Sequence, residues 1–218
     1  MTVLRSLLEL KTWRAHVTGD VGFVPTMGAL HAGHLNLVQQ SMQHCPNTLV
    51  SIYINPTQFN NQDDFEKYPS TVQEDILLLQ DLGEVVVYVP NEKDIYPKGV
   101  VSRSFDFGGL ESHMEGSGRP GHFEGMATVV TRLFELIAPQ NAFFGEKDFQ
   151  QLAIIKYVVT KEGWPVKIVP TTTVREKDGL AMSSRNRRLS KNQRDSAKEV
   201  YHIIQEWIST GLSDRFGR

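Results

Sequence analysis

Two histidines three residues apart, His31 and His34, are the side chains whose types and spacing most directly suggest chemistry. Each imidazole can donate a hydrogen bond and gains a proton near neutral pH. Donors fixed around a phosphorus that gathers charge as it reacts are a usual means of catalysing transfer at phosphorus. The pair lies in segment 25–34 with Gly28 and Gly33, which let a backbone approach a ligand closely. The segment therefore predicts a site for nucleotide phosphates.

The elements around the pair are predicted to be a strand, a turn and a helix. Residues 21–24 form an apolar run, and after His34 the apolar residues Leu35, Leu37 and Val38 follow at helical spacing. The start of such a helix leaves unpaired N–H groups and the positive end of its dipole at the turn, which favours phosphate. Neither common Gly-rich phosphate motif occurs here. A zinc pair is the other specific interpretation, but the turn has no H-E-x-x-H pattern and no nearby cysteine ligand.

Strands and helices alternate along the rest of the chain. The pattern predicts an opening helix near 4–11, strands at 48–55, 85–90, 141–144 and 166–169, and helices at 70–82, 122–137 and 145–162. It also predicts an edge strand at 102–107, a capping box of Ser70 with Gln73, and a last helix from Ser190 with an apolar side. This alternation is typical of an α/β fold, a Rossmann-like parallel sheet with helices on both faces. Ligands of such sheets bind beyond the carboxyl ends of the strands.

Polar side chains follow several of the predicted strands. Asn55 and Gln58 come after the second strand. Lys147 is placed to meet a phosphate as a point charge, Asp148 to hold a ligand hydroxyl or a water on Mg2+, and Gln151 to face the same way one helical turn later. A capped helix with solvent-facing charges explains the last three equally well.

Two loops offer further positive charge and hydroxyl groups. Ser183, Ser184 and Arg185 suit triphosphate oxygens, and Arg185 can bind them through two parallel hydrogen bonds. Arg119 and His122, in a glycine-rich turn, can add positive charge to the crevice, although a plain loop explains them as well.

Composition narrows the class of protein. The chain has 218 residues, 40% of them hydrophobic, and a net charge of −2, so it resembles neither a nucleic-acid binder nor a membrane-surface binder. No apolar run reaches the length of a membrane span. The single cysteine, Cys45, suits a reducing cytoplasm and is interpreted as a buried structural thiol.

Five sequence blocks in order carry a family resemblance. His31-Ala32-Gly33-His34 resembles the H-x-G-H element of the nucleotidylyltransferase superfamily, and 182–185 resembles its second, K-M-S-K-S-type loop. With IYINPTQF, GRPGHF and FGEKDFQQ they resemble the pantoate–β-alanine ligase family. The resemblance implies an ATP-dependent ligase that condenses pantoate with β-alanine through pantoyl adenylate, giving pantothenate, AMP and pyrophosphate. It further implies ATP as substrate with Mg2+, a cytoplasmic homodimer, and neither nucleic acid nor membrane as partner.

The resemblance also assigns roles to individual residues. It implies catalysis by His34 as proton donor, with His31 and Lys147 beside it. It implies ATP binding by Met27, Gly28, Ala29, Leu30, His31, Ala32, Gly33, His34, Gly145, Glu146, Lys147, Asp148, Val174, Met182, Ser183, Ser184 and Arg185. It implies binding of pantoate and β-alanine by Pro25, Asn55, Gln58, Gln151, Arg119 and His122.

The sequence predicts two domains, and two alternatives to the ligase function stay open. We expect a Rossmann-like nucleotide- and pantoate-binding domain at 1–172 and the start of a small, apparently incomplete C-terminal lid domain at 173–218. Glu124 stands where related sequences often carry a basic residue. The alternatives to the ligase are a nucleotidylyltransferase of coenzyme synthesis and a truncated, catalytically impaired nucleotide-binding form.

Overall fold

A computed structural model describes residues 1–210 and contains one six-stranded sheet in which every pair of neighbours is parallel. The strands are β1 (Thr2–Leu4), β2 (Val21–Thr26), β3 (Asn47–Ile52), β4 (Val86–Tyr88), β5 (Asn141–Gly145) and β6 (Lys167–Thr171), in the spatial order β1-β4-β3-β2-β5-β6. The strand order reverses between β2 and β5. Because ligands bind at such a reversal, this is the expected place for a site. The predicted α/β class is confirmed.

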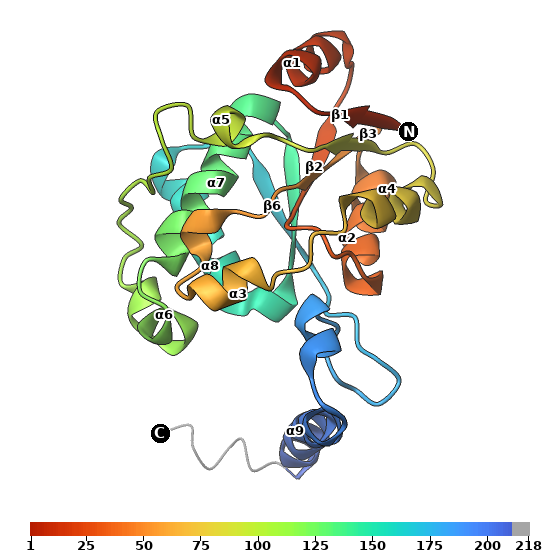
Figure 1. Ribbon diagram of the computed structural model, residues 1–218, viewed down its shortest axis with the longest axis vertical. Helices are drawn as coiled ribbons and strands as arrows, with labels where there is room; N and C mark the ends of the chain where they lie inside the picture. Colours follow the sequence, from red (N-terminus) through yellow and green to blue (C-terminus); the bar gives the residue numbers. More distant parts are fainter. Residues whose placement is uncertain (211–218) are drawn as a thin grey trace.

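Helices cover both faces of the sheet (Figure 1). They are α1 (Leu7–His16), α2 (Ala32–His44), α3 (Gln62–Glu66), α4 (Val72–Gln80), α5 (Glu92–Ile95), α6 (Met114–Gly118), α7 (His122–Ile137), α8 (Phe149–Glu162) and α9 (Lys191–Ser209). Two hydrophobic cores result, one against α1, α7 and α8 and one against α2 and α4. Alternate residues of one strand enter different cores, as Phe23 and Val24 of β2 do.

Helix α7 packs closely against a 3-10 turn, Pro56–Gln58, that follows β3. An added Cβ at Gly125 would lie 2.3 Å from the carbonyl oxygen of Thr57, so a larger residue cannot occupy this position without moving the turn. Close approach at Gly125 therefore fixes Gln58 relative to the carboxyl edge of the sheet.

Three local predictions were wrong. Segment 102–107 is not a strand, because Arg103 donates its backbone N–H to the hydroxyl of Thr128 on α7 instead of to a sheet neighbour. The opening helix begins at Leu7, and the preceding residues form β1. The capping box of Ser70 with Gln73 does not form; α4 has Thr71 at its N-cap, whose hydroxyl donates to the carboxylate of Asp75.

The chain beyond β6 leaves the body of the molecule (Figure 1). It contains a β-bridge between Arg175 and Ala181, a 3-10 helix Ser184–Arg188, and α9. The apolar side of α9 forms as predicted, but Ile203 and Val200 on it are 63% and 58% exposed. Among residues 1–210, no helix combines the length and apolar character needed to cross a membrane.

Candidate functional site

A cleft of about 240 Å³ opens at the carboxyl edge of the sheet, where the strand order reverses. It brings together the predicted residues Pro25, Met27, His31, Gly33, His34, Gln58, Arg119, His122, Gly145, Lys147, Asp148, Gln151, Val174, Met182, Ser183, Ser184 and Arg185. Its lining does not include Gly28, Ala29, Leu30, Ala32, Asn55 or Glu146.

Each of the two histidine rings is held by a hydrogen bond from a backbone amide of the same segment. The Nδ1 atom of His31 accepts a hydrogen bond from the N–H of Gly33 at 3.1 Å, and the Nδ1 atom of His34 accepts from the N–H of His31 at 3.3 Å. The ring centroids are 4.1 Å apart. An added Cβ at Gly33 would come within 2.9 Å of the His31 ring, so glycine is required here to seat the imidazole. With both Nδ1 atoms accepting, each neutral ring carries its proton on Nε2.

Both histidines are neutral at pH 7, because their surroundings lower the pKa of each ring. Burial, with smaller contributions from the neighbouring His31 and Lys147, lowers the pKa of His34 to about 3. Burial and then the charge of Lys147 lower the pKa of His31 in the same way. The neutral ring of His34 can therefore donate a hydrogen bond but has no acidic proton to transfer.

The expectation of unpaired N–H groups at the start of the helix is corrected for Gly33, because the ring of His31 accepts from that amide. In the glycine turn before the helix, a buried acid accepts from two further amides. The carboxylate of Asp75 on α4 accepts from the N–H of Ala29 at 2.9 Å and of Leu30 at 2.7 Å. Gly28 has a φ of +81°, and a Cβ there would lie 2.9 Å from Asp75. The turn is thus shaped around Asp75, a buried acid that the sequence analysis did not identify. The one feature of the sequence that pointed to it is its place in the first turn of α4, where acids are common.

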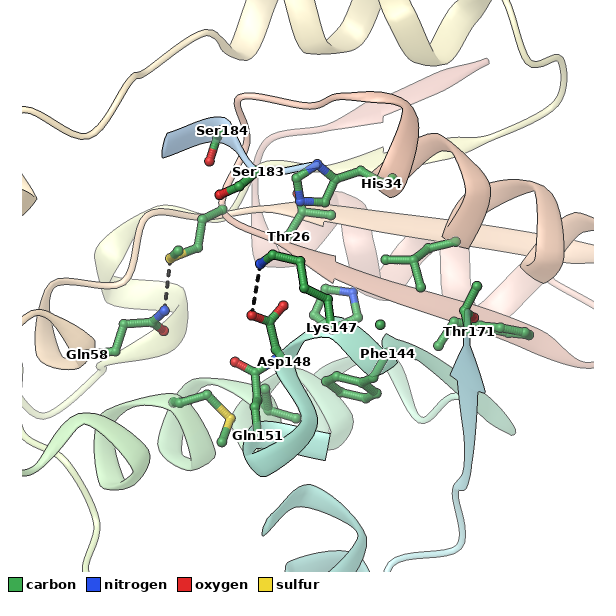
Figure 2. A pocket seen from close by; sticks show the side chains of 18 of the residues that line it. Thr26, His34, Gln58, Phe144, Lys147, Asp148, Gln151, Thr171, Ser183 and Ser184 are labelled. Carbon is green, nitrogen blue, oxygen red and sulfur yellow. Dashed lines mark hydrogen bonds and ion pairs between the residues drawn. The ribbon is translucent and has the colours of Figure 1, made fainter. Parts of the chain in front are cut away.

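Gln58 is held at the cleft by a buried amide. Asn55, fully buried, donates from Nδ2 to Oε1 of Gln58 at 3.2 Å and to the carbonyl of Gly125 at 3.0 Å. The hydroxyl of Tyr96 donates to Asn55 Oδ1. Gln58 in turn points its Nε2 at the sulfur of Met27, 2.9 Å away (Figure 2). Asn55, predicted to lie at the pantoate pocket, thus orients Gln58 and is not among the residues that line the cleft.

Arg119 and His122 hold the same turn from its other side. His122 donates from Nδ1 to the carbonyl of Gln58 at 2.7 Å, and Arg119 donates to that oxygen at 3.3 Å. Arg119 also pairs with Glu115. Burial lowers the pKa of His122, so this ring is neutral at pH 7. Both residues line the cleft, as predicted, while bracing its wall.

Charged groups from a 3-10 turn, Glu146–Asp148, and an amide group from the first turn of α8 face the cleft. Lys147 lies 3.1 Å from the carboxylate of its neighbour Asp148, and Gln151 follows one turn later (Figure 2). Gln150 points elsewhere and donates to the carbonyls of Leu110 and His113. Of these two adjacent glutamines, Gln150 therefore supports the wall of the cleft and Gln151 faces into it.

The second loop meets the histidine turn directly. Met182 approaches Gly33, since a Cβ at Gly33 would lie 3.8 Å from the Cβ of Met182. Arg185 forms a 2.8 Å ion pair with Asp64 of α3 and lies over the ring of Tyr68. The hydrogen bond from Arg185 lowers the pKa of Asp64. Asp64 and Tyr68 were not predicted, because both are remote in sequence from the loop.

The walls of the cleft differ on the two faces of the sheet. On the α7 face the apolar residues include Met126, Val129, Val130 and Leu133, with Pro25 of β2 and Phe144 of β5. On the α2 face they are Leu37, Phe143, Val174 and Met182. Within residues 1–210, two buried hydroxyls of the lining, Ser51 and Thr171, have no hydrogen-bond partner.

Comparison with known proteins gives concordant matches. The family model described as Pantoate-beta-alanine ligase matches residues 2–215. A pantothenate synthetase of Flavobacterium psychrophilum is 46% identical over 210 residues, covering 94% of this chain and 74% of that protein. One of Neisseria meningitidis serogroup C is 44% identical over 220 residues, covering 100% and 79%.

Solved structures give the same result. The crystal structure of pantothenate synthetase from Thermus thermophilus matches with a TM-score of 0.89 and 43% identity, covering 97% of this chain and 77% of that one. A pantoate-beta-alanine ligase from Francisella tularensis, complexed with beta-gamma ATP and beta-alanine, matches with a TM-score of 0.89 and 38% identity, covering 94% and 79%.

Proposed function

The chain belongs to the pantoate–β-alanine ligase family, and from this we propose that its cleft is where pantoate, ATP and β-alanine react. It is an AMP-forming carbon–nitrogen ligase that condenses pantoate with β-alanine to give pantothenate, AMP and pyrophosphate. The observation that carries the proposal is one cleft that joins two neutral imidazoles, a cationic edge and two cleft-facing glutamines.

The α7 face of the cleft suits pantoate. Pantoate has a branched apolar centre flanked by hydroxyl groups and a carboxylate. Val130 and Leu133 offer the apolar wall, and Gln58 and Gln151 offer amide donors and acceptors on either side. Asn55 supports this placement indirectly, because it holds Gln58 in one orientation.

The histidine turn and the second loop suit the triphosphate. The Nε2–H groups of His31 and His34 are donors that need no further proton, and Lys147 adds a positive charge beside them. Ser183 and Arg185 approach from the opposite loop. Donors held in place in this way stabilise charge as it develops at phosphorus.

Two displacements complete the proposed reaction. A carboxylate oxygen of pantoate attacks the α-phosphorus of ATP, and pyrophosphate leaves with the electron pair of the broken bond. The amine of β-alanine then attacks the acyl carbon of pantoyl adenylate, loses a proton, and releases AMP. His34 donates a hydrogen bond during the first step; the charge of bound triphosphate raises its pKa from the unliganded value toward that of a proton donor.

Mg2+ belongs to the proposal as a companion of the triphosphate. The described residues contain no group of three or more histidine, cysteine or acidic side chains arranged to hold a metal. Asp148, which lines the cleft beside Lys147, is the carboxylate placed to accept a water of an ion that arrives with ATP. Such an ion supplies neutralisation of phosphate charge.

Product analysis tests the function. The chain is incubated with ATP, pantoate and Mg2+, with and without β-alanine, and AMP, pyrophosphate and pantothenate are measured. We expect pantothenate and AMP in equal amounts only with β-alanine. Pyrophosphate release to an acceptor regardless of β-alanine would identify a nucleotidylyltransferase instead, and ATP binding without AMP would identify a catalytically impaired form.

Three further expectations remain part of the proposal. We propose a division into domains 1–172 and 173–218, supported by the end of the sheet at Thr171. We also propose a homodimer, supported by the resemblance to the family, and a cytoplasmic location, supported by a sole, buried, unpaired Cys45. Light scattering on the purified chain measures the oligomeric state, and a monomeric mass at assay concentration would contradict the dimer.

A further inference from the structure

Thr171 ends β6 with a hydroxyl that has no hydrogen-bond partner among the described residues. The residue is 5% exposed and lines the cleft. Buried polar groups in native proteins are nearly always paired, so an unpaired one at a binding cleft needs an explanation. None of the roles proposed above uses this hydroxyl.

Open space lies beside this side chain. The register partner of Thr171 on β5 is Gly145, and paired residues of neighbouring strands project to the same face of the sheet. A Cβ built at Gly145 meets no atom within 4 Å. Figure 2 shows Thr171 at the tip of β6, in the same cleft as His34, Lys147 and Phe144. The side chain of Thr171 therefore borders a part of the cleft that a ligand can enter, with its hydroxyl buried at that border.

The surroundings of Thr171 have the chemistry of a purine pocket. Leu37, one helical turn beyond His34 on α2, and Phe143 of β5 belong to the same core cluster on this face. Val174 and Met182 complete an apolar lining. A purine base has apolar faces and a polar edge, so it fits between such walls with its edge directed at a hydroxyl. The histidines that are proposed to bind the phosphates line the same cleft.

We propose that Thr171 determines nucleobase specificity, its Oγ1 accepting a hydrogen bond from the 6-amino group of adenine. The inference rests on the proposed use of ATP and names a residue that reads the base. A threonine hydroxyl rotates and can donate as well as accept, so it can also satisfy a 6-oxo group. The discriminating probe is therefore a purine with hydrogen at position 6.

The experiment compares ATP with purine riboside 5′-triphosphate on the full chain. Dissociation constants are measured by calorimetry for the wild type, Thr171→Val, which has nearly the same shape, and Thr171→Ser, which keeps the hydroxyl. We expect the wild type and Thr171→Ser to bind ATP about three- to tenfold more tightly than the analogue, which is the worth of one neutral hydrogen bond. Thr171→Val should bind the two equally.

Stability without nucleotide gives a second, independent readout. Thr171→Val removes an unpaired hydroxyl, so its melting temperature should equal or exceed that of the wild type. The matched control is Thr48→Val: Thr48 is similarly buried, but its hydroxyl bonds to Ser41 at 2.8 Å. The control should melt at a lower temperature and keep the wild-type ratio of affinities.

Failure of this inference can be told apart from failure of the proposed function. An unchanged ratio of affinities in Thr171→Val, or a melting temperature well below the wild type, overturns the role of Thr171 while leaving ATP binding intact. A wild type that binds neither triphosphate overturns the proposed function, and this inference with it.

Discussion

Asp64 of α3 holds Arg185 of the second loop in a 2.8 Å ion pair across 121 residues of sequence. A second arginine, Arg188, reaches the other oxygen of the same carboxylate at 2.6 Å. The arginine expected to meet the triphosphate is therefore paired with an acid in this structure. Under the role proposed for Arg185, ATP and Asp64 compete for its guanidinium group. The ion pair also links the second loop to α3.

Asp64→Asn tests this competition. Removing the carboxylate frees Arg185 and lowers negative charge near the triphosphate, so we expect the KM for ATP to fall about two- to fivefold. The effect should shrink at high salt, because the pair is partly exposed. Asp63→Asn, on the same helix and paired with Lys67, is the control and should leave the KM unchanged. A higher KM in Asp64→Asn would mean that Asp64 positions Arg185 for ATP.

His34 variants separate hydrogen-bond donation from proton transfer. We expect His34→Ala to lower kcat by about 10²- to 10³-fold, the usual cost of losing one transition-state donor. Glutamine keeps an N–H donor and can accept from the N-cap amide, as Nδ1 of His34 does, so His34→Gln should recover part of this loss. Steady-state kinetics at saturating substrates measure both. If glutamine were no better than alanine, proton transfer by His34 would be the better account.

The pH dependence of stability reports the buried histidines. In the folded chain burial lowers the pKa of His34 to about 3, whereas the unfolded chain takes up that proton near the ordinary value of 6.5. The unfolded state then binds more protons, so stability falls as the pH drops from about 6.5 toward 3, by up to about 1.4 kcal/mol per pH unit for this group. Urea unfolding between pH 4 and 7, in about half-unit steps, measures the slope. It should be shallower in His34→Gln and unchanged in His16→Asn, which alters an exposed histidine of α1.

Asp75→Asn tests the buried acid under the glycine turn. An amide can accept from only one of Ala29 and Leu30 through its oxygen, and its NH2 group faces the other N–H. We expect a loss of about 1–3 kcal/mol in the free energy of unfolding and a raised KM for ATP, because the turn carries His31. Glu74→Gln, the exposed neighbour on α4, should change neither. Wild-type stability in Asp75→Asn would show that the two hydrogen bonds contribute little.

Much of the fold is determined by local sequence. Helix α7 occupies the predicted residues, and β5 and β6 lie within one or two residues of the predicted strands. Periodicity suffices there because burial on one side of a helix or strand repeats at a fixed interval. The histidine pair was also accessible, since residues three apart at a helix start are neighbours whatever the rest of the chain does.

Tertiary structure decided what these groups can do. Packing of α7 against the turn after β3 made Asn55 a support of Gln58, and packing of α4 gave the amides of Ala29 and Leu30 to Asp75; the sequence indicated neither contact. Tertiary structure also set the protonation state of His34. Burial lowers its pKa, and so does Lys147, which lies more than a hundred residues away in the sequence. Hydrogen-bond partners and desolvation depend on distances through space, and no local pattern encodes them.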